Sequence, residues 1–358
     1  MAVYTTIDNP ELYFQVKLYS GTGSAQSITL DGSENMQPDL VWLKRRDGTG
    51  AHRLCDAVRG ATKLLQASAG DAEQTDSDTL TSFDSDGFTL GADAAPYKVN
   101  VSGQTMAAWC WKANGAGSSN SDGSITSTVS ANTTAGFSIV KYNGTGANAT
   151  VGHGLGVAPK VIMVKNLENS YEWIIGHEDL DTNGTGFSDN WYFNGFSTGA
   201  RNQNATASWN STSPTNSVFS LHSGATYMNA SGEANIAYCF AEKTGYSKFG
   251  KYTGNENTNG TFVYTGFKPS FVLFKKSTGS AANWQLWDNK RDTFNPVEKA
   301  LHPDATAVAS TDQDIDFLSN GFKLRTSASH LNADGVVFIY MAFGNTIVGT
   351  NNIPATAR

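Results

Sequence analysis

The amino-acid sequence predicts an all-β protein built from three tandem β-sandwich modules of jelly-roll-like topology. The first observation is composition, because only 16% of the 358 residues are charged and 36 glycines accompany many Ser, Thr and Asn residues. This mixture favours short strands joined by turns. The second observation is an internal repeat. The third is that no window of helical length carries an apolar pattern with a period of 3.6 residues. An immunoglobulin-like sandwich is the alternative topology.

The internal repeat is clearest where a proline opens an apolar run. Such runs occur at residues 38–44, 159–165 and 269–275, at intervals of about one domain length. Each copy also ends in an apolar strand rich in aromatic residues, at residues 106–112, 236–242 and 337–343. Because every copy has several short strands with apolar faces to bury, we expect two stacked sheets in each.

The repeat divides the chain into predicted domains. Residues 1–114 are expected to form the first sandwich, 136–244 the second and 245–358 the third. Residues 115–135 are rich in Gly, Ser and Asn, which indicates a flexible linker. The segment that precedes the first repeat contains Pro10 and lacks strand alternation, so we expect it to be an N-terminal attachment segment.

Charge and cysteine content exclude several classes of protein. The formal net charge is −7 and no long basic run occurs, which argues against nucleic-acid binding. No apolar stretch is long enough for membrane insertion, and the N-terminus does not resemble a signal peptide. The three cysteines match no zinc-binding spacing and are an odd number for a disulfide framework. We therefore expect synthesis in the cytoplasm and no cofactor.

A motif of the form Leu-x-Asp-x-x-Arg occurs in the first and third copies. It predicts ion pairs of Asp56 with Arg59 and of Asp288 with Arg291. A carboxylate and a guanidinium can bind each other through two hydrogen bonds, which would fix a loop to the sheet. Ligand binding by the same residues is the alternative interpretation.

Aromatic residues gather among Asn and Ser residues in the second copy. They are Tyr171, Trp173, Trp191, Tyr192 and Trp209. Aromatic rings stack on sugar faces and Asn side chains hydrogen-bond to hydroxyls, so this cluster is a candidate glycan-binding site. The alternative is that these rings belong to the core or to contacts between subunits.

Three acidic residues alternate at Asp312, Asp314 and Asp316. Their oxygens are candidate calcium ligands, although the glycine at which a calcium loop turns is missing. The alternative is that the three acids lie on the outer face of an edge strand. Paired carboxylates such as Glu178/Asp179 do not recur in all copies, so we predict that the protein is not an enzyme.

Residues 136–159 and 245–269 resemble a module that is common in virion proteins of marine bacteriophages, chiefly phages of cyanobacteria and of abundant marine bacteria. The resemblance extends from about Tyr13 to Val348. Proteins of this kind are usually labelled tail fibre or putative structural protein.

The resemblance implies a non-enzymatic structural protein on the particle surface, with a tail-fibre or adhesin-like role in host attachment. Other virion proteins of the tail or capsid are the expected partners. A homo-oligomer, in the case of a fibre a homotrimer, is expected, with a host surface glycan as a candidate ligand. The alternatives are a capsid-decorating or head-fibre protein, a lectin-like carbohydrate-binding module and a polysaccharide depolymerase.

Overall fold

The computed structural model describes residues 6, 7, 9–93, 97–181, 183–204, 206, 208–311 and 314–346. In this part of the chain nearly all regular structure is antiparallel β-sheet, which confirms the predicted all-β class. The helical elements are the short turns η1 (Pro10–Leu12), η2 (Glu178–Leu180), α1 (Thr226–Asn229) and α2 (Ser329–Asn332). None of them is long and apolar enough to cross a membrane.

The first stretch of the chain forms a large and a small sheet, which we call the first sheet pair. The large sheet has the strand order β1–β9–β3–β4–β5–β6, and the small sheet has the order β2–β8–β7. The bounds are β1 (Phe14–Ser20), β2 (Gln26–Thr29), β3 (Leu40–Arg45), β4 (Arg53–Asp56), β5 (Lys63–Gln66), β6 (Gln74–Thr75), β7 (Leu80–Asp84), β8 (Gly87–Leu90) and β9 (Thr105–Trp111).

The second sheet pair has the largest sheet in the described chain. Its strand order is β10–β11–β12–β19–β14–β15–β16–β17, and the small sheet consists of β13 and β18. The bounds are β10 (Ser118–Asn120), β11 (Ser127–Asn132), β12 (Phe137–Asn143), β13 (Ala149–Gly152), β14 (Val161–Asn166), β15 (Ile174–His177), β16 (Trp191–Asn194), β17 (Asn202–Gln203), β18 (Val218–Leu221) and β19 (Ala234–Phe240).

The third sheet pair has a large sheet of order β20–β26–β22–β23 and a small sheet of order β21–β25–β24. The bounds are β20 (Ser247–Thr253), β21 (Phe262–Tyr264), β22 (Phe267–Lys276), β23 (Gln285–Asp288), β24 (Ile315–Leu318), β25 (Gly321–Leu324) and β26 (Val337–Thr346).

The three large sheets share a central arrangement of four strands. The equivalent sets are β1–β9–β3–β4, β12–β19–β14–β15 and β20–β26–β22–β23. The register agrees as well, because the proline-initiated strand pairs with the final aromatic strand at Leu40–Trp111, Val161–Phe240 and Phe271–Phe343. These equivalences allow positions to be compared between the pairs.

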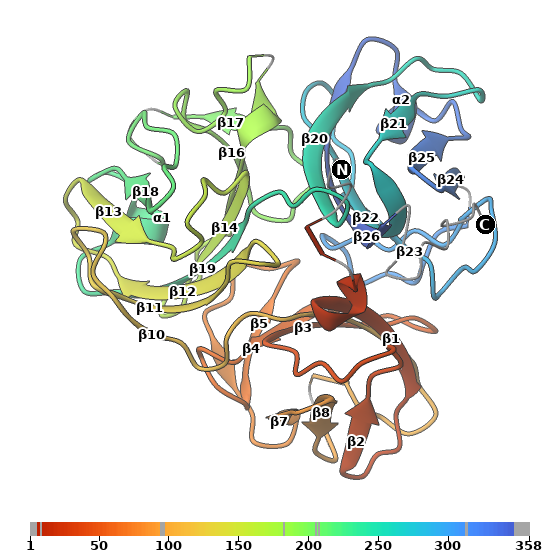
Figure 1. Ribbon diagram of the computed structural model, residues 1–358, viewed down its shortest axis with the longest axis horizontal. Coiled ribbons are helices and arrows are strands. Elements are labelled where there is room, and N and C mark those ends of the chain that lie inside the picture. The colour runs from red at the N-terminus through yellow and green to blue at the C-terminus, as the bar shows by residue number, and fades with distance from the viewer. Residues whose placement is uncertain are drawn as a thin grey trace.

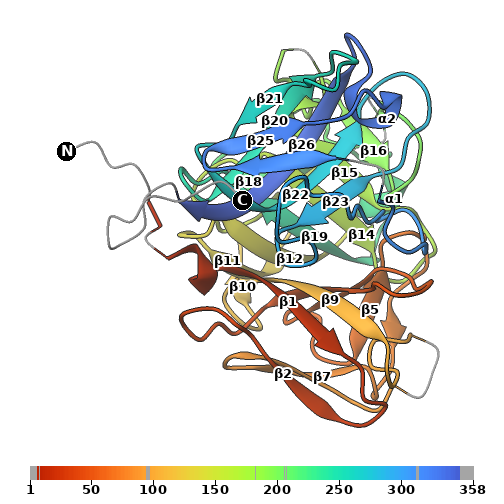
Figure 2. The ribbon, with the colours of Figure 1, turned by 90° about the vertical axis from the view of Figure 1, so that its right-hand side faces the viewer.

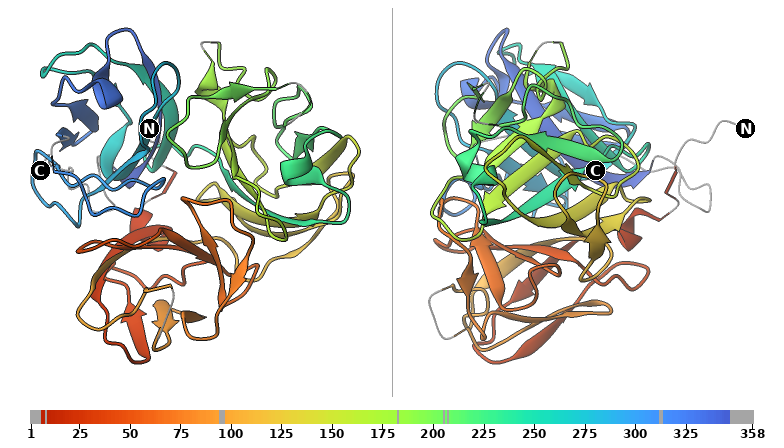
Figure 3. Two further views of the ribbon diagram at one scale, coloured as in Figure 1. Left: turned by 180° about the vertical axis from the view of Figure 1, so that it is seen from behind. Right: turned by 90° about the vertical axis from the view of Figure 1, so that its left-hand side faces the viewer.

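Each sheet pair encloses its own apolar core, and a further core lies where the three large sheets meet. Figure 1 shows the three pairs around a common centre, and Figure 3 shows the same arrangement from behind. In β3, Val41 and Leu43 face the core of the first pair, while Leu40 and Trp42 face the shared core. We call this shared cluster the central core. It buries the second face of each large sheet.

The segment 115–135 differs from the flexible linker that its composition predicts. It carries β10 and β11, which extend the large sheet of the second pair, and Val129 pairs with Val140 of β12. An antiparallel strand with one solvent-facing side accommodates Ser, Thr and Asn, so polar composition does not by itself prevent pairing. The predicted domain boundaries stay predictions.

The predicted N-terminal attachment segment lies partly outside the described residues, which omit 1–5 and 8. Its described part is docked on the body, because Ile7 is buried in the central core and the Asn9 side chain caps η1 by accepting from the Glu11 N–H at 3.1 Å.

Figure 2 shows the first pair lying against the other two.

Candidate functional site

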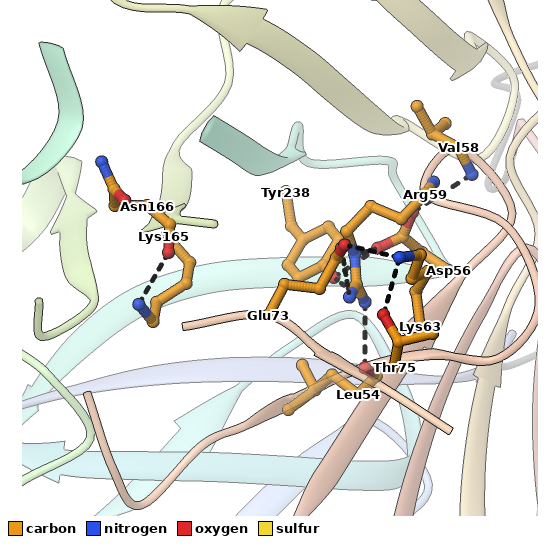
Figure 4. Close-up of polar contacts among 10 residues, drawn as sticks. All are labelled: Leu54, Asp56, Val58, Arg59, Lys63, Glu73, Thr75, Lys165, Asn166 and Tyr238. Atoms are coloured by element: carbon orange, nitrogen blue, oxygen red, sulfur yellow. Dashed lines mark hydrogen bonds and ion pairs between the residues drawn. The ribbon is translucent and has the colours of Figure 1, made fainter. Parts of the chain in front are cut away.

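The motif residues of the first sheet pair form a buried network at the end of β4. The Arg59 Nε donates to Asp56 Oδ2, and the Arg59 backbone N–H donates to Asp56 Oδ1 at 2.9 Å. The guanidinium also donates to the Leu54 carbonyl at 2.9 Å. The Tyr238 hydroxyl, from β19 of the second pair, donates to Asp56 Oδ2 at 2.8 Å. Figure 4 shows that this network connects the first and second pairs.

Electrostatics keep Arg59 charged within this network. Burial opposes the charge of Arg59, but Asp56, Tyr238 and Glu73 together raise the pKa of Arg59 above its usual value. Burial, followed by the charge of Asp56, raises the pKa of the Tyr238 hydroxyl, so this hydroxyl stays a donor. Glu73 extends the network, with 3.4 Å to Arg59 Nη1 and 3.5 Å to Lys63 Nζ.

The third sheet pair repeats the same network. Arg291 Nε lies 2.5 Å from Asp288 Oδ2, the Arg291 N–H donates to Asp288 Oδ1 at 2.8 Å, and Nη2 donates to the Leu286 carbonyl at 3.0 Å. Here the donor from the neighbouring pair is Trp109 of β9, whose Nε1 donates to Asp288 Oδ2 at 3.1 Å. The network therefore connects the third pair to the first.

His177 occupies the equivalent position in the second sheet pair. In the strand register His177 pairs with Val161, just as Asp56 pairs with Leu40 and Asp288 pairs with Phe271. Its Nε2 lies 3.3 Å from the Tyr340 carbonyl in the third pair, and its Nδ1 accepts from the Asp179 N–H at 3.0 Å. Met341 stands where the other pairs offer Tyr238 or Trp109 and cannot donate, so the histidine supplies the donor itself. Burial lowers the pKa of His177 to about 4.

A buried lysine is the last residue of the apolar run in each large sheet. We call these lysines, together with the Asp–Arg and His177 networks described above, the seam between the sheet pairs. Lys44 is fully buried, and its Nζ donates to the carbonyls of Gly50 at 2.7 Å, Thr306 at 3.0 Å and Ala307 at 2.9 Å. The last two belong to the third pair. Burial, followed by the charges of Arg45 and Arg291, lowers the pKa of Lys44 to about 8.

The two equivalent lysines also donate to backbone carbonyls, and Lys275 reaches a neighbouring pair. Lys275 Nζ donates to the carbonyls of Ala282 at 2.6 Å and Ser197 at 2.8 Å, the latter in the second pair. Lys165 Nζ donates to the Asn166 carbonyl at 2.7 Å within its own pair (Figure 4). Burial lowers the pKa of each to about 8. Sequence reasoning missed these lysines, although their position at the end of each apolar run was a visible signal.

The aromatic cluster predicted as a glycan site does not form one exposed face. Trp173 is fully buried in the central core, where its Nε1 donates to the Gln66 carbonyl at 2.9 Å. Trp209 and Tyr192 are buried in the core of the second pair. The Trp209 Nε1 donates to the Trp191 carbonyl at 3.1 Å, so its polar edge is also used inside the protein. The prediction is wrong for these three residues, because all three rings are buried in apolar cores.

The other two members of that cluster are half-buried and have different partners. The Tyr171 ring packs against the Tyr227 ring in a tilted arrangement, with ring centroids 5.1 Å apart. The Trp191 ring lies 4.0 Å from the Arg201 guanidinium. The two rings therefore have separate neighbours and do not form one surface with the buried members.

The acidic residues proposed as calcium ligands are only partly described, because Asp312 lies outside the described residues. Asp316 pairs with Arg325 at 3.4 Å, which already balances its charge. Across the described ranges no group of three or more His, Cys, Asp or Glu side chains is close enough to hold a metal ion. Asp316 lies on the edge strand β24 and Asp314 directly precedes it. This placement agrees with the alternative interpretation.

The sequence Gly195-Phe196-Ser197-Thr198-Gly199 has the spacing of a hydrolase nucleophile turn. Its structural context differs, because the segment leads from β16 to the strand β17 rather than into a helix. The Ser197 hydroxyl donates to the Asn194 carbonyl at 2.9 Å. This serine therefore belongs to a turn, and its carbonyl accepts a hydrogen bond from Lys275.

Two aromatic rings that sequence reasoning missed are exposed on the small sheet of the third pair. Phe262 and Tyr264 keep 44% and 58% of their surface accessible, while Val263 between them is buried. They lie on β21, which is an edge strand. The alternating sequence Phe-Val-Tyr was the available signal, but alternation does not tell which set faces outward.

An open groove of about 590 Å³ borders the same sheet. It is lined by Thr258, Asn259, Asn295, Pro296, Asp314, Asp316 and Arg325. Across the sheet, Phe262 pairs with Lys323, and Lys323 pairs with Asp316, so the aromatic strand and the groove share one outer surface. We call this surface, formed by β21, β25, β24 and the groove, the outer face of the third pair.

Comparison with known proteins identifies the family but no named relative. No curated protein and no solved structure matches the chain. A family described as a domain of unknown function (DUF7483) matches residues 9–346, which include all three sheet pairs. The chain therefore belongs to this family of domains of unknown function.

Proposed function

We propose that this protein is a non-enzymatic structural component of a bacteriophage particle, exposed on the particle surface with a tail-fibre or adhesin-like role. The observation that carries the proposal is the repeated seam, in which buried Asp, Arg, His and Lys side chains connect the sheet pairs. A charged residue used in this way stabilises one arrangement of the body and is withdrawn from chemistry on a substrate. The resemblance to phage virion modules adds independent support.

The proposal requires other virion proteins as partners and synthesis in the host cytoplasm before assembly. A tail fibre and a capsid-decorating or head-fibre protein need the same rigid body. They differ in where the body is mounted, so location on the particle distinguishes them.

The test is to purify particles of the phage that encodes the chain and to locate the protein by electron cryomicroscopy with antibody labelling. We expect a fixed number of copies on the outer surface of the tail. Label on the head surface would favour capsid decoration. A protein that is abundant in infected cells but missing from purified particles would contradict the proposal.

The oligomeric state is a separate expectation. A fibre role predicts a homotrimer, although this chain already brings three of its own sheet pairs around one centre. Light scattering on the purified protein should give three times the mass of one chain. A monomer both in solution and on the particle would remove the fibre trimer from the proposal and leave a single-chain surface protein.

A second candidate, a carbohydrate-binding module, is favoured by one observation. The outer face of the third pair exposes Phe262 and Tyr264 beside a polar groove. This face would supply the adhesive part of the proposed role.

A further inference from the structure

The two exposed rings on β21 have the arrangement of a stacking platform. Phe262 and Tyr264 are separated by one residue in a strand, which places their Cα atoms roughly 7 Å apart on the same side of the sheet. Both rings are exposed, and large apolar side chains exposed as a pair often mark a binding surface. Two rings in a row can each support one unit of an extended chain of sugars.

The groove beside the rings offers hydrogen-bonding groups that the protein does not use. Within the described residues, the side chains of Thr258, Asn259 and Asp314 make no hydrogen bond to another residue. Arg325 has a side chain that is 47% exposed and only a 3.4 Å contact with Asp316. Hydroxyl, amide, carboxylate and guanidinium groups together provide both donors and acceptors for sugar hydroxyls.

The charge of this face favours neutral glycans over anionic ones. Among the described residues this face carries two carboxylates, Asp314 and Asp316, and two cations, Lys323 and Arg325, so neither sign is in strong excess there. The whole chain has a net charge of −7, which repels a polyanion at long range. A neutral polysaccharide fits both the local balance and the overall charge better than a sulfated or uronic chain.

A protein strand added to the β21 edge is less suited to this surface. β21 has only three residues and lies between Gly260 and Gly266, and short edge strands resist extension by another chain. The polar lining of the groove also lacks the apolar pockets that would hold alternate side chains of a peptide.

We propose that the outer face of the third sheet pair binds a neutral polysaccharide, with pyranose rings stacked on Phe262 and Tyr264 and their hydroxyls bonded in the adjoining groove. The proposal rests on the adhesive role proposed above and gives that role a site and a ligand class.

The first sheet pair supplies a matched design for the test. Its residues at the equivalent positions are Ser27 and Thr29, which pair with Thr89 and Gly87 as the two rings pair with Lys323 and Gly321. The double variant Phe262→Ser/Tyr264→Thr therefore places residues on β21 that the same fold already carries on β2. We call it the outer-face variant. Its folding is checked by its thermal unfolding curve.

The experiment is calorimetric titration of the full chain with cellohexaose, maltohexaose and mannohexaose, and with hexagalacturonate as the anionic counterpart. We expect saturable binding of at least one neutral hexasaccharide, and an affinity at least about tenfold lower in the outer-face variant. Tyr227→Ala, which removes an exposed ring from the second pair, and Ser27→Ala/Thr29→Ala should bind as the unchanged protein does.

Three results would overturn the proposal. They are no binding of any neutral hexasaccharide, equal binding by the outer-face variant and the unchanged protein, and tighter binding of hexagalacturonate than of the neutral chains. These results are independent of where the protein sits on a particle. Failure of the glycan site and failure of the structural role can therefore be told apart.

Discussion

The small sheets of the first and third pairs have the same strand pairing and very different outer surfaces. On the first, short hydroxyl side chains bind one another: Ser27 and Thr89 are 2.9 Å apart, and Thr89 and Ser82 each donate to Asp84 at 2.7 Å. Polar groups satisfied in this way have little need of a ligand.

The third pair places Phe262, Lys323 and Asp316 in the row where the first has Ser27, Thr89 and Ser82. The inward positions are apolar in both sheets, as shown by the pairs Ile28–Phe88 and Val263–Phe322. The inward residues keep the same apolar character in both sheets, while the outward residues differ in size and polarity.

The inner seam shows the opposite behaviour, because the Asp–Arg pair and its bonds to the backbone recur in the first and third pairs. If this contrast is correct, changes in the seam should lower stability in whichever pair they are made. Changes on the outer face should leave stability nearly unchanged.

The largest effect is expected from removing the seam arginines. Arg59→Met and Arg291→Met each leave a buried aspartate without its cation, which should lower the free energy of unfolding by about 3–5 kcal/mol. The two losses should be similar, because the Asp–Arg pair and its bonds to the backbone N–H and the Leu carbonyl recur in both networks. Urea denaturation at neutral pH measures both.

Arg325→Met is the matched control for the seam arginines, because it breaks an ion pair that is half exposed. Its cost should stay below about 1 kcal/mol. A seam variant as mild as this control would show that the seam does not hold the pairs together.

His177 distinguishes the second pair from the other two and should give the next largest effect. Below pH 6.5 the unfolded imidazole takes up a proton, while burial holds the pKa of the native His177 near 4. Stability is therefore full above pH 6.5 and falls as the pH drops toward 4, by about 3 kcal/mol from this residue.

His177→Gln can keep both hydrogen bonds without titrating. Between pH 7 and pH 4 the free energy of unfolding should fall less in this variant than in the unchanged protein. Parallel curves would contradict this, because they would mean that His177 takes up its proton at the same pH in the native and unfolded protein.

The seam lysines should give a smaller effect of the same sign, at alkaline rather than acidic pH. Burial lowers the native pKa of Lys165 to about 8, against an ordinary value of about 10.4 in the unfolded chain. Between these values the unfolded chain holds a proton that the native protein has released, so stability rises with pH.

Relative to Lys165→Met, the unchanged protein should gain about 2 kcal/mol between pH 8 and pH 10.5. Lys44→Met and Lys275→Met should give the same relative gain, because burial lowers the pKa of those lysines to about 8 as well. A difference that stays constant over this range would mean that these lysines titrate normally.

The smallest effect is expected on the outer face. The Phe262→Ser/Tyr264→Thr variant should change the free energy of unfolding by no more than about 1 kcal/mol, since both side chains are already about half exposed. A loss as large as that of the seam variants would mean that the rings are part of the fold rather than a binding surface.

The sequence predicted the all-β class because strand periodicity and turn residues are local signals. The Asp–Arg motifs could be found because both partners lie three residues apart. The apolar runs at residues 40–43, 161–164 and 271–274 also signalled strands buried on both faces. They did not signal what covers the second face, so the central core was missed.

The glycan candidates failed for a related reason. Trp173 and Trp209 have polar neighbours in the sequence, but the direction of each side chain is set by the strands and loops that pack around it. The exposure of Phe262 and Tyr264 is likewise decided by register, because a shift of one residue would have buried both rings and exposed Val263.

The most direct test of this account is differential scanning calorimetry of the full chain. A central core shared by all three sheet pairs predicts a single unfolding transition, with a van't Hoff enthalpy equal to the calorimetric enthalpy. Separate transitions, or a van't Hoff enthalpy close to one third of the calorimetric value, would contradict it, because the sheet pairs would then unfold as independent modules.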